Sequence, residues 1–342
     1  MNRTLARRAT RSTTLRPTAA IAASSAILSV LLLPVPPAAA QAWPAKPIRL
    51  ISPFVTGGAI DLIVRPMQPH YEKALGQPIV IDYRPGAGGS IGAAMVAKER
   101  PDGYTLLATT TGPNAVAQSL FPDLPYHVAK SFSWIAAWGG FPILIAVHNQ
   151  TPIKSVKDMI DAARAKPGAL TYGTSGTGSV GHLAGVLVGM ETRVDILHVG
   201  FKGAGDAQRS LMGQEIAMII NTLGAHIAQL EPKGPFRALA VTSAKRAAAA
   251  PQVPTMSELG YPNVTITNWF MMAGPSGLAP DVVKRMADAT YLAMREPAVR
   301  EAHAQIGLES LGELTPQQMF DFVSKEAERW APVVKASGAK AQ

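Results

Sequence analysis

The chain of 342 residues contains no cysteine, which excludes disulfide bonds, thiolate metal sites and a lipid anchor on a cleavage-site cysteine. Aromatic residues are only 6% of the sequence, and no basic stripe with interleaved aromatics appears, so a nucleic-acid surface is not indicated. Histidine, aspartate and glutamate nowhere cluster at metal-ligand spacing. We therefore expect no metal and no cofactor.

A run long enough to cross a membrane is also missing, because the apolar stretch at 19–33 is short of the roughly 20 residues of a spanning helix. A head with five arginines precedes it, and the small residues at 34–40 follow it. This pattern is typical of a secretory signal peptide. We expect residues 1–42 to be this signal peptide, cleaved after about Ala40 or Ala42.

The expected leader bears on the location of the protein and on its net charge. The pair Arg7-Arg8 lacks the apolar residues of a twin-arginine signal, which favours the general export route and a soluble periplasmic protein without a lipid anchor. Of the 32 basic residues, five lie in the leader, which leaves 27 against 23 acidic residues, a net charge of +4. The basic character of the whole chain therefore comes partly from its targeting segment.

The remainder, about 300 residues, alternates short apolar runs with helix-period segments, which predicts an α/β fold with parallel sheets covered by helices. A chain of this length favours two domains. Strands are expected at 48–52, 79–82, 105–109, 143–147, 170–173, 195–199, 216–220 and 237–242. Helices are expected at 92–99, 156–166, 181–190, 205–213, 223–230, 280–296 and 315–331.

Two helices carry additional local signals. Pro66 and Pro69 fall inside the first helix of the mature chain, and an interior proline removes a backbone hydrogen bond, so we expect a kink or break near Arg65. Thr315, followed by Pro316 and Gln318, has the pattern of a capped helix start.

The segment 53–61 joins the first strand to this helix and contains Gly57 and Gly58. Glycine allows the backbone to turn its N–H groups toward a guest, and the first turn of a helix has about four N–H groups without intrahelical partners. Such a junction binds carboxylate or phosphate without needing a lysine. The segment therefore predicts an anion-binding loop.

A second glycine-rich junction spans 173–182 and adds the hydroxyl groups of Thr174, Ser175 and Ser179. Hydroxyls can donate to a carboxylate. The alternative is an ordinary helix entry capped by serine or threonine. The glycines at 176, 178 and 181 also match the G-x-G-x-x-G pattern of dinucleotide-binding proteins, but this match is weak. Such proteins have an acidic residue at the end of the next strand, whereas Asp195 begins that strand here.

Ser90 lies in a G-x-S-x-G pattern like that of a hydrolase nucleophile elbow, with His182 or His226 as candidate partners. A loop separates Ser90 from its preceding strand, which argues against the elbow. The segment can instead cap a helix or form a third wall of a ligand site. His182, Lys202 and Asn221 remain open between ligand contact and structural or surface roles.

These motifs together resemble a known family, the substrate-binding receptors of tripartite tricarboxylate transporters, also called the Bug family of extracytoplasmic solute receptors. The matching segments are WPAKPIR at 43–49, PFVTGGAID at 53–61, RPGAGGSIGA at 84–93, PDGYTLL at 101–107, GTSGTGSVGHLAG at 173–185, FKGAG at 201–205, RALAVTSAKR at 237–246, VPTMSELGYP at 253–262 and RWAPVVKASG at 329–338.

The resemblance implies a two-lobed fold like that of type II periplasmic binding proteins, each lobe a mainly parallel sheet flanked by helices, with a two-segment hinge. Lobe 1 would comprise 43–147 and 243–342, and lobe 2 would comprise 148–242. A small carboxylate would bind between them. The ligand-binding residues it implies, together with the third wall, are Phe54, Val55, Thr56, Gly57, Gly58, Ala59, Asp61, Gly86, Ala87, Gly88, Thr174, Ser175, Gly176, Ser179, His182, Lys202 and Asn221.

Within this set Asp61 is expected to order its loop rather than touch an anion. The chain departs from the family pattern at Val55-Thr56, at Phe201 where tyrosine is usual, and in the segment 221–224, so the ligand of a relative cannot be transferred. The expected protein is a monomeric, non-catalytic receptor whose partners are a small carboxylate and membrane carrier subunits. A receptor for a membrane kinase and an exported hydrolase using Ser90 are the alternatives.

Overall fold

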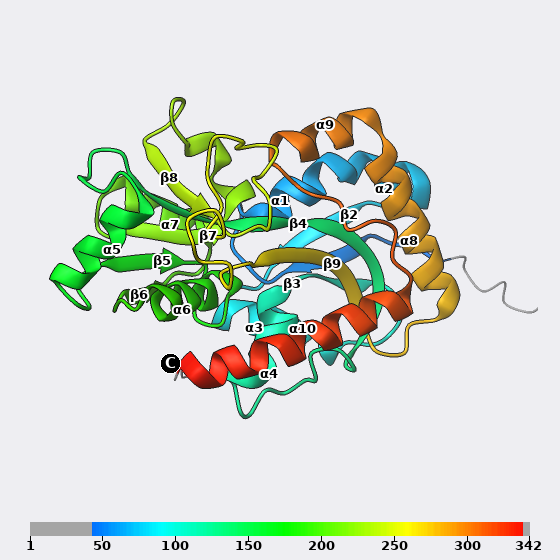
Figure 1. Ribbon diagram of the computed structural model, residues 1–342. Helices are drawn as coiled ribbons and strands as arrows, with labels where there is room; N and C mark the ends of the chain where they lie inside the picture. The colour runs from blue at the N-terminus through cyan, green and yellow to red at the C-terminus, as the bar shows by residue number, and fades with distance from the viewer. Residues whose placement is uncertain (1–42, 338–342) are drawn as a thin grey trace, which may run out of the picture. The chain divides into compact units, whose positions relative to one another are not determined.

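A computed structural model describes residues 43–337 of the chain, so the expected signal peptide lies outside the described residues. These residues form an α/β arrangement in which helices flank a nine-stranded sheet (Figure 1). The strands are β1 (Ile48–Ser52), β2 (Ile79–Tyr83), β3 (Thr105–Thr110), β4 (Phe132–His148), β5 (Thr171–Thr174), β6 (Leu197–Gly200), β7 (Met218–Thr222), β8 (Phe236–Val241) and β9 (Thr267–Pro275).

The long strand β4 joins two halves of this sheet, whose order is β2-β1-β3-β9-β4-β7-β5-β6 with β8 also paired to β4. Residues 132–142 of β4 pair with β9, whereas residues 143–148 pair with β7 and β8. We call β1, β2, β3, β9 and 132–142 the first half, and β5–β8 and 143–148 the second half. Parallel pairs form the outer part of each half, and antiparallel pairs with β4 and β9 form the centre.

Helices cover both faces of the sheet. They are α1 (Ala59–Val64), α2 (Gln68–Leu75), α3 (Ser90–Ala97), α4 (Ala117–Leu120), α5 (Val156–Ala165), α6 (Val180–Thr192), α7 (Ala204–Met212), α8 (Pro280–Arg295), α9 (Pro297–Gln305) and α10 (Pro316–Ser337). The last helix, α10, packs against β4 and reaches α6, so it contacts both halves (Figure 1).

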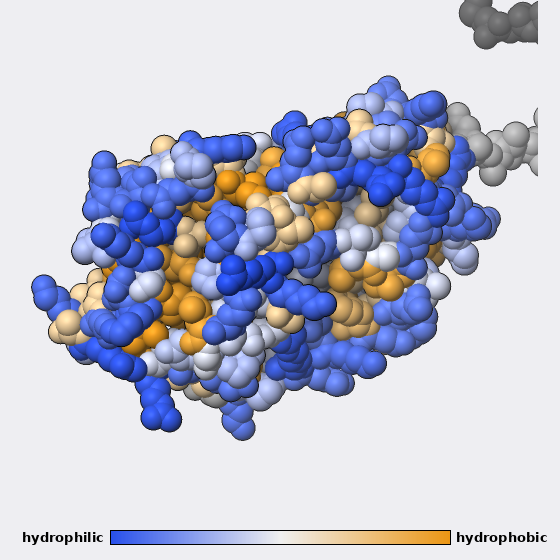
Figure 2. Space-filling view, turned by 45° about the horizontal axis from the view of Figure 1, so that its top comes forward, coloured by the Kyte–Doolittle hydropathy of each residue, from blue (hydrophilic) through white to orange (hydrophobic). Residues whose placement is uncertain are grey.

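Alternation along the strands separates the two apolar layers. Ile48 and Leu50 of β1 belong to the core under α1, α2 and α8, whereas Ile51 faces the core under α3 and α10. This is the two-residue period of a strand covered on both faces. On the outside, one face is mainly hydrophilic, with hydrophobic side chains visible in the recesses between polar ones (Figure 2).

The expected strands all form, but the sequence analysis missed β9 and the first eleven residues of β4. Both are apolar on both faces, so they lack the alternation that identifies a half-exposed strand. Helix α9 was also missed.

The helix predicted at 223–230 is wrong. That segment consists of two short 3-10 turns, Leu223–Ala225 and Ile227–Gln229, because Gly224 packs directly on the Phe141 ring and His226 leaves the helical backbone region at φ −126°.

The two local helix signals are confirmed. The first helix breaks at Arg65, where a 3-10 turn, Arg65–Met67, separates α1 from α2. At the start of α10 the Thr315 hydroxyl accepts a hydrogen bond from the Gln318 N–H at 3.2 Å, and the Gln318 side chain accepts one from the Thr315 N–H at 2.9 Å. Among the described residues, no helix has the length and apolar character needed to cross a membrane.

Candidate functional site

A cavity of about 30 Å³ lies where the two halves of the sheet meet. Its walls come from the loop after β1, the start of α1, the loop after β5, the start of α7 and the facing ends of β7 and β9. The lining residues are Ser52, Phe54, Val55, Gly58, Ala59, Ile60, Thr110, Ser175, Ala204, Asn221, Thr222, Ala225, Asn268 and Phe270. None of these carries a charged side chain, so a guest here meets main-chain groups, hydroxyls and amides beside apolar side chains such as Val55 and Phe270.

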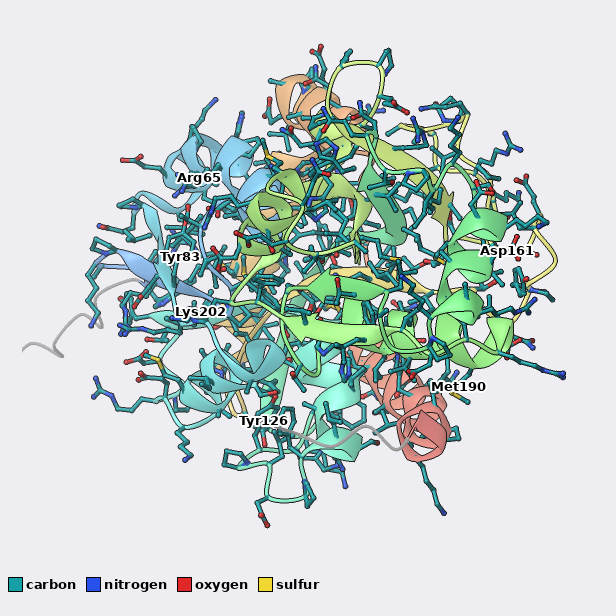
Figure 3. The ribbon with its side chains drawn as sticks, turned by 90° about the vertical axis from the view of Figure 1, so that its left-hand side faces the viewer. Arg65, Tyr83, Tyr126, Asp161, Met190 and Lys202 are labelled. Carbon is teal, nitrogen blue, oxygen red and sulfur yellow. The ribbon has the colours of Figure 1, made fainter. Side chains whose placement is uncertain are left out.

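The loop after β1 is held in place by the buried carboxylate of Asp61, which is only 4% exposed. Its Oδ2 accepts a hydrogen bond from the N–H of Gly57 at 2.6 Å, and its Oδ1 accepts from Tyr83 Oη at 2.5 Å and Arg65 Nε at 3.0 Å. The carboxylate of Asp61 also raises the pKa of Arg65. Arg65 and Tyr83 lie together on the same side of the molecule (Figure 3). Asp61 therefore orders the loop, and the Gly57 N–H is already engaged.

The loop after β5 uses most of its hydroxyl groups internally. The Thr174 hydroxyl accepts from the Gly176 N–H at 3.2 Å and lies 2.7 Å from His198 Nε2. Ser179 caps α6 by accepting from the His182 N–H at 3.3 Å, which is the capping role considered as the alternative for this segment. Ser175 is the hydroxyl residue of this loop that lines the cavity.

Two stacked histidines support this loop from behind. The rings of His182 and His198 lie 4.1 Å apart between centroids, and His182 Nδ1 accepts a hydrogen bond from the Gly178 N–H at 3.2 Å. Burial lowers the pKa of His182 to about 4. Burial, together with the neighbouring His182, lowers the pKa of His198 to about 3. Both rings are therefore neutral near pH 7. A neutral His182 ring can accept the hydrogen bond from the Gly178 N–H at its Nδ1.

Loops from the two halves of the sheet are in close contact at Gly88 and Gly203, where a side chain would not fit. A Cβ on Gly88 would overlap Thr177 O and would lie 2.7 Å from Ser179 N. A Cβ on Gly203 would overlap Cγ2 of Val55. These contacts join the loop after β2 to the hydroxyl loop, and the segment after β6 to the anion-binding loop. Because Val55 and Gly58 of the anion-binding loop and Ser175 of the hydroxyl loop line the same cavity, the two loops converge there instead of lying on opposite sides of the molecule.

The facing ends of β7 and β9 add two buried amides to the cavity, Asn221 and Asn268. Asn221 was singled out from the sequence, whereas Asn268 was missed because the strand that carries it was missed. A polar residue at the start of an otherwise apolar run, as in Asn268-Trp269-Phe270, was the signal available. Thr222 connects the two amides: its N–H donates to Asn221 Oδ1 at 3.0 Å, and its hydroxyl accepts from Asn268 Nδ2 at 2.9 Å.

The structure brings only part of the predicted set to the cavity wall. The predicted residues that line it are Phe54, Val55, Gly58, Ala59, Ser175 and Asn221. Those outside the lining are Thr56, Gly57, Asp61, Gly86, Ala87, Gly88, Thr174, Gly176, Ser179, His182 and Lys202. Lys202 is exposed, as its alternative surface role required (Figure 3). Ligand contact by any of these residues stays a prediction.

The hydrolase alternative has little geometric support. Ser90 is buried at 7% exposure, and neither of its candidate partners is oriented toward it by a hydrogen bond in the described residues. His182 stacks on His198, and the His226 ring lies 3.1 Å from Gln208 Oε1. A general base must lie within hydrogen-bond reach of its nucleophile, and no such contact joins Ser90 to either histidine in the described residues.

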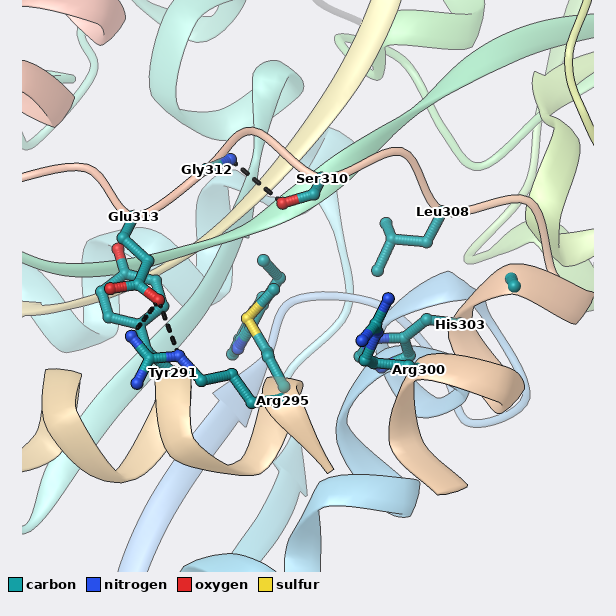
Figure 4. Close-up of a pocket in the computed structure, with 11 residues that line it drawn as sticks. Tyr291, Arg295, Arg300, His303, Leu308, Ser310, Gly312 and Glu313 are labelled. Atoms are coloured by element: carbon teal, nitrogen blue, oxygen red, sulfur yellow. Dashed lines mark hydrogen bonds and ion pairs between the residues drawn. The ribbon is translucent and has the colours of Figure 1, made fainter. Parts of the chain in front are cut away.

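A larger pocket of about 410 Å³ lies elsewhere, between α8, α9 and the segment that follows α9 (Figure 4). Two of its polar side chains are engaged locally: Arg295 pairs with Glu313 at 2.5 Å, and the His303 ring lies 2.9 Å from the carbonyl of Ile63. It takes no wall from the two glycine-rich loops. We therefore assign the candidate site to the smaller cavity.

Comparison with known proteins agrees with this geometry. The family model described as the tripartite tricarboxylate transporter family receptor matches residues 63–339. Protein BugT of Bordetella pertussis is 35% identical over 305 residues, which cover 89% of this chain and 93% of BugT.

Solved structures extend the comparison to the fold. Periplasmic binding protein BugD superposes with a TM-score of 0.83 at 28% identity, covering 88% of this chain and all of BugD. MatC from Rhodopseudomonas palustris, solved with bound malate, gives 0.82 at 28% identity over 85% of this chain and all of MatC. The R. palustris protein Rpa4515, solved with adipate, gives 0.82 at 33% identity over 86% of this chain and 98% of its own.

The fold is thus the two-lobed, type II periplasmic-binding-protein-like fold that the resemblance implied. With a family model matched along most of its length and a close relative over nine-tenths of it, the chain belongs to the family of tripartite tricarboxylate transporter receptors, which includes the Bug proteins.

Proposed function

We propose that the protein is a periplasmic solute receptor that binds a small carboxylate between its lobes and delivers it to the membrane subunits of a tripartite tricarboxylate-type transporter. The observation that carries this proposal is the single cavity walled by Val55, Gly58 and Ala59 from one half of the sheet and by Ser175 and Asn221 from the other. Malate and adipate in the neighbouring structures support a carboxylate as the ligand class.

Neutral donors hold the anion in this proposal. Helix α1 begins at Ala59 with no side chain capping its first turn, so its leading N–H groups are available to a carboxylate beside Gly58. The hydroxyl of Ser175 donates from the facing wall, which Asn221 also lines.

A hinge accompanies the cavity. Thr242 is fully buried, and its hydroxyl accepts from the Ile143 N–H at 2.9 Å and donates to the Ile266 carbonyl at 2.7 Å. Thr242 thus connects the two chain segments that pass between the halves of the sheet, one at Ile143 and the other at 242–266. We place the bending point at these residues, with lobe 1 as 43–147 and 243–342 and lobe 2 as 148–242. Ligand then favours the closed arrangement because it contacts both lobes only there.

The proposal includes the absence of catalysis, the monomeric state and export by the N-terminal leader. A sensory role with a membrane kinase is the second candidate, since a kinase would recognise the same closed pair of lobes. Genes for two membrane carrier subunits beside this one favour transport, and a gene for a histidine kinase favours sensing.

Carboxylates are expected to stabilise the protein, because a ligand that binds only the folded state raises its free energy of unfolding. In a thermal-shift screen, mono- and dicarboxylic acids at millimolar concentration should raise the melting temperature, whereas the methyl esters and amides of the same acids should not. Flat melting curves across the acid panel would count against a carboxylate receptor.

Closing of the lobes is expected to depend on Gly203. Its backbone is extended at φ −179°, which any residue adopts, so Gly203→Ala folds normally, but the added Cβ overlaps Val55 Cγ2 when the loops meet. Valine has little freedom to rotate away. Overpacking of this kind costs about 1–3 kcal/mol, which corresponds to an affinity weakened by roughly 5- to 150-fold in calorimetry.

Two further variants separate this clash from other effects. Gly203→Ala combined with Val55→Ala leaves the new Cβ 3.4 Å from the backbone nitrogen and 3.5 Å from the Cβ of residue 55, and should restore binding. Gly205→Ala, whose Cβ would have its nearest neighbour, Arg209 Nη1, at 3.8 Å, should bind like the wild type. Unchanged affinity in Gly203→Ala alone would show that these loops do not meet in the ligand-bound form.

The histidine pair predicts a loss of stability in acid. Both folded-state pKa values, about 4 for His182 and about 3 for His198, lie below the unfolded value near 6.5. At a pH between the folded and unfolded values, the unfolded chain therefore binds more protons than the folded protein. The stabilisation is complete above about pH 6.5 and is lost as the pH falls toward 4. Each histidine adds at most about 1.4 kcal/mol per pH unit to the slope. Urea unfolding of His182→Gln should give a shallower dependence of the free energy of unfolding on pH than the wild type shows between about pH 4 and 6.5.

A further inference from the structure

The wall of the cavity formed by β7 and β9 contains two amide atoms that are buried and unpaired. Asn221 is 2% exposed and Asn268 is 5% exposed, and both line the cavity. Among the residues that the structure describes, Asn221 Nδ2 and Asn268 Oδ1 have no hydrogen-bond partner. Burying a donor or an acceptor without a partner costs free energy, so a protein retains such atoms where a guest completes them.

Within the described part of the chain, the structure leaves one end of each amide free. Asn221 Oδ1 accepts from the backbone N–H of Thr222 at 3.0 Å, and a backbone N–H can only donate, so the Nδ2 donor is the free end. Asn268 Nδ2 donates to the Thr222 hydroxyl at 2.9 Å, which leaves Oδ1 as a free acceptor. This wall of the cavity therefore offers one donor and one acceptor.

A second carboxylate matches this pair poorly. An ionised carboxylate only accepts hydrogen bonds, so it would be repelled by Asn268 Oδ1, and no lysine, arginine or histidine lines the cavity to offset its charge. A hydroxyl group accepts from one partner and donates to another, so it satisfies both amides at once.

We propose that the ligand is a small hydroxycarboxylate, whose carboxylate binds at the loop after β1 and whose hydroxyl accepts from Asn221 Nδ2 and donates to Asn268 Oδ1. This inference rests on the proposed carboxylate-receptor function and narrows its ligand class. Asn221 and Asn268 are then the residues that determine specificity, and they select against acids that lack the hydroxyl because both amides would stay unpaired.

Matched pairs of acids test this with the wild-type protein. Glycolate and acetate, lactate and propionate, 3-hydroxybutyrate and butyrate, and malate and succinate each differ by one hydroxyl. Calorimetric titration should show the hydroxylated member of the best-binding pair at least tenfold tighter than its deoxy partner. Equal affinities within every pair that binds would overturn the inference while leaving the carboxylate receptor intact. Failure of all eight acids to bind would overturn the receptor function itself.

Variants then locate the hydroxyl contact. Asn221→Ala and Asn268→Ala should each reduce the hydroxylated-to-deoxy affinity ratio to below threefold. Asn263→Ala, which removes an exposed asparagine amide bonded to Glu191, should keep the wild-type ratio. The readout is the ratio of two affinities measured on the same variant. Partial loss of folded protein therefore does not change this ratio. A ratio that survives both cavity variants would contradict the assignment.

Discussion

The close approach of main-chain loops from the two halves of the sheet is the constraint on which the site depends. Gly88 lies against the backbone at Thr177 and Ser179, and Gly203 lies against Val55, with no room for a Cβ at either place. These two contacts hold the loops after β1 and β2 against the loops after β5 and β6, beside one cavity. The glycines are therefore needed for packing between loops, in addition to the backbone turns that the sequence suggested.

Electrostatics is consistent with the proposed anion site although its wall contains no cation. The carboxylate of Asp61 stays buried beside the loop, but it is satisfied by the Gly57 N–H, Tyr83 and Arg65 and faces away from the cavity. The polar groups that line the cavity are uncharged dipoles, and in the proposed function they hold a carboxylate through directed hydrogen bonds. The neutral histidine pair behind the second loop follows the same principle, because burial makes its charged form costly.

Much of the fold was predictable because its signals are local. Strand-to-helix junctions with glycines, the proline break at Arg65 and the Thr315 cap each depend on a few neighbouring residues. The site was predictable only in part. Val55 and Asn221 line the cavity as expected, but the hydroxyls of Thr174 and Ser179 are used within their own loop, and Asn268 comes from a strand without alternation. Which side chains face a cavity depends on contacts between segments distant in sequence, and no local pattern reports them.

The central claim is that a carboxylate closes the two lobes on each other, and a distance between the lobes measures it most directly. The absence of native cysteine allows spin labels at Glu72→Cys on α2 and Lys166→Cys after α5, both exposed positions in different halves. With a saturating carboxylate, pulsed electron paramagnetic resonance should give one narrow distance distribution, shorter than the distribution without ligand. Identical distributions with and without a bound carboxylate would contradict the account.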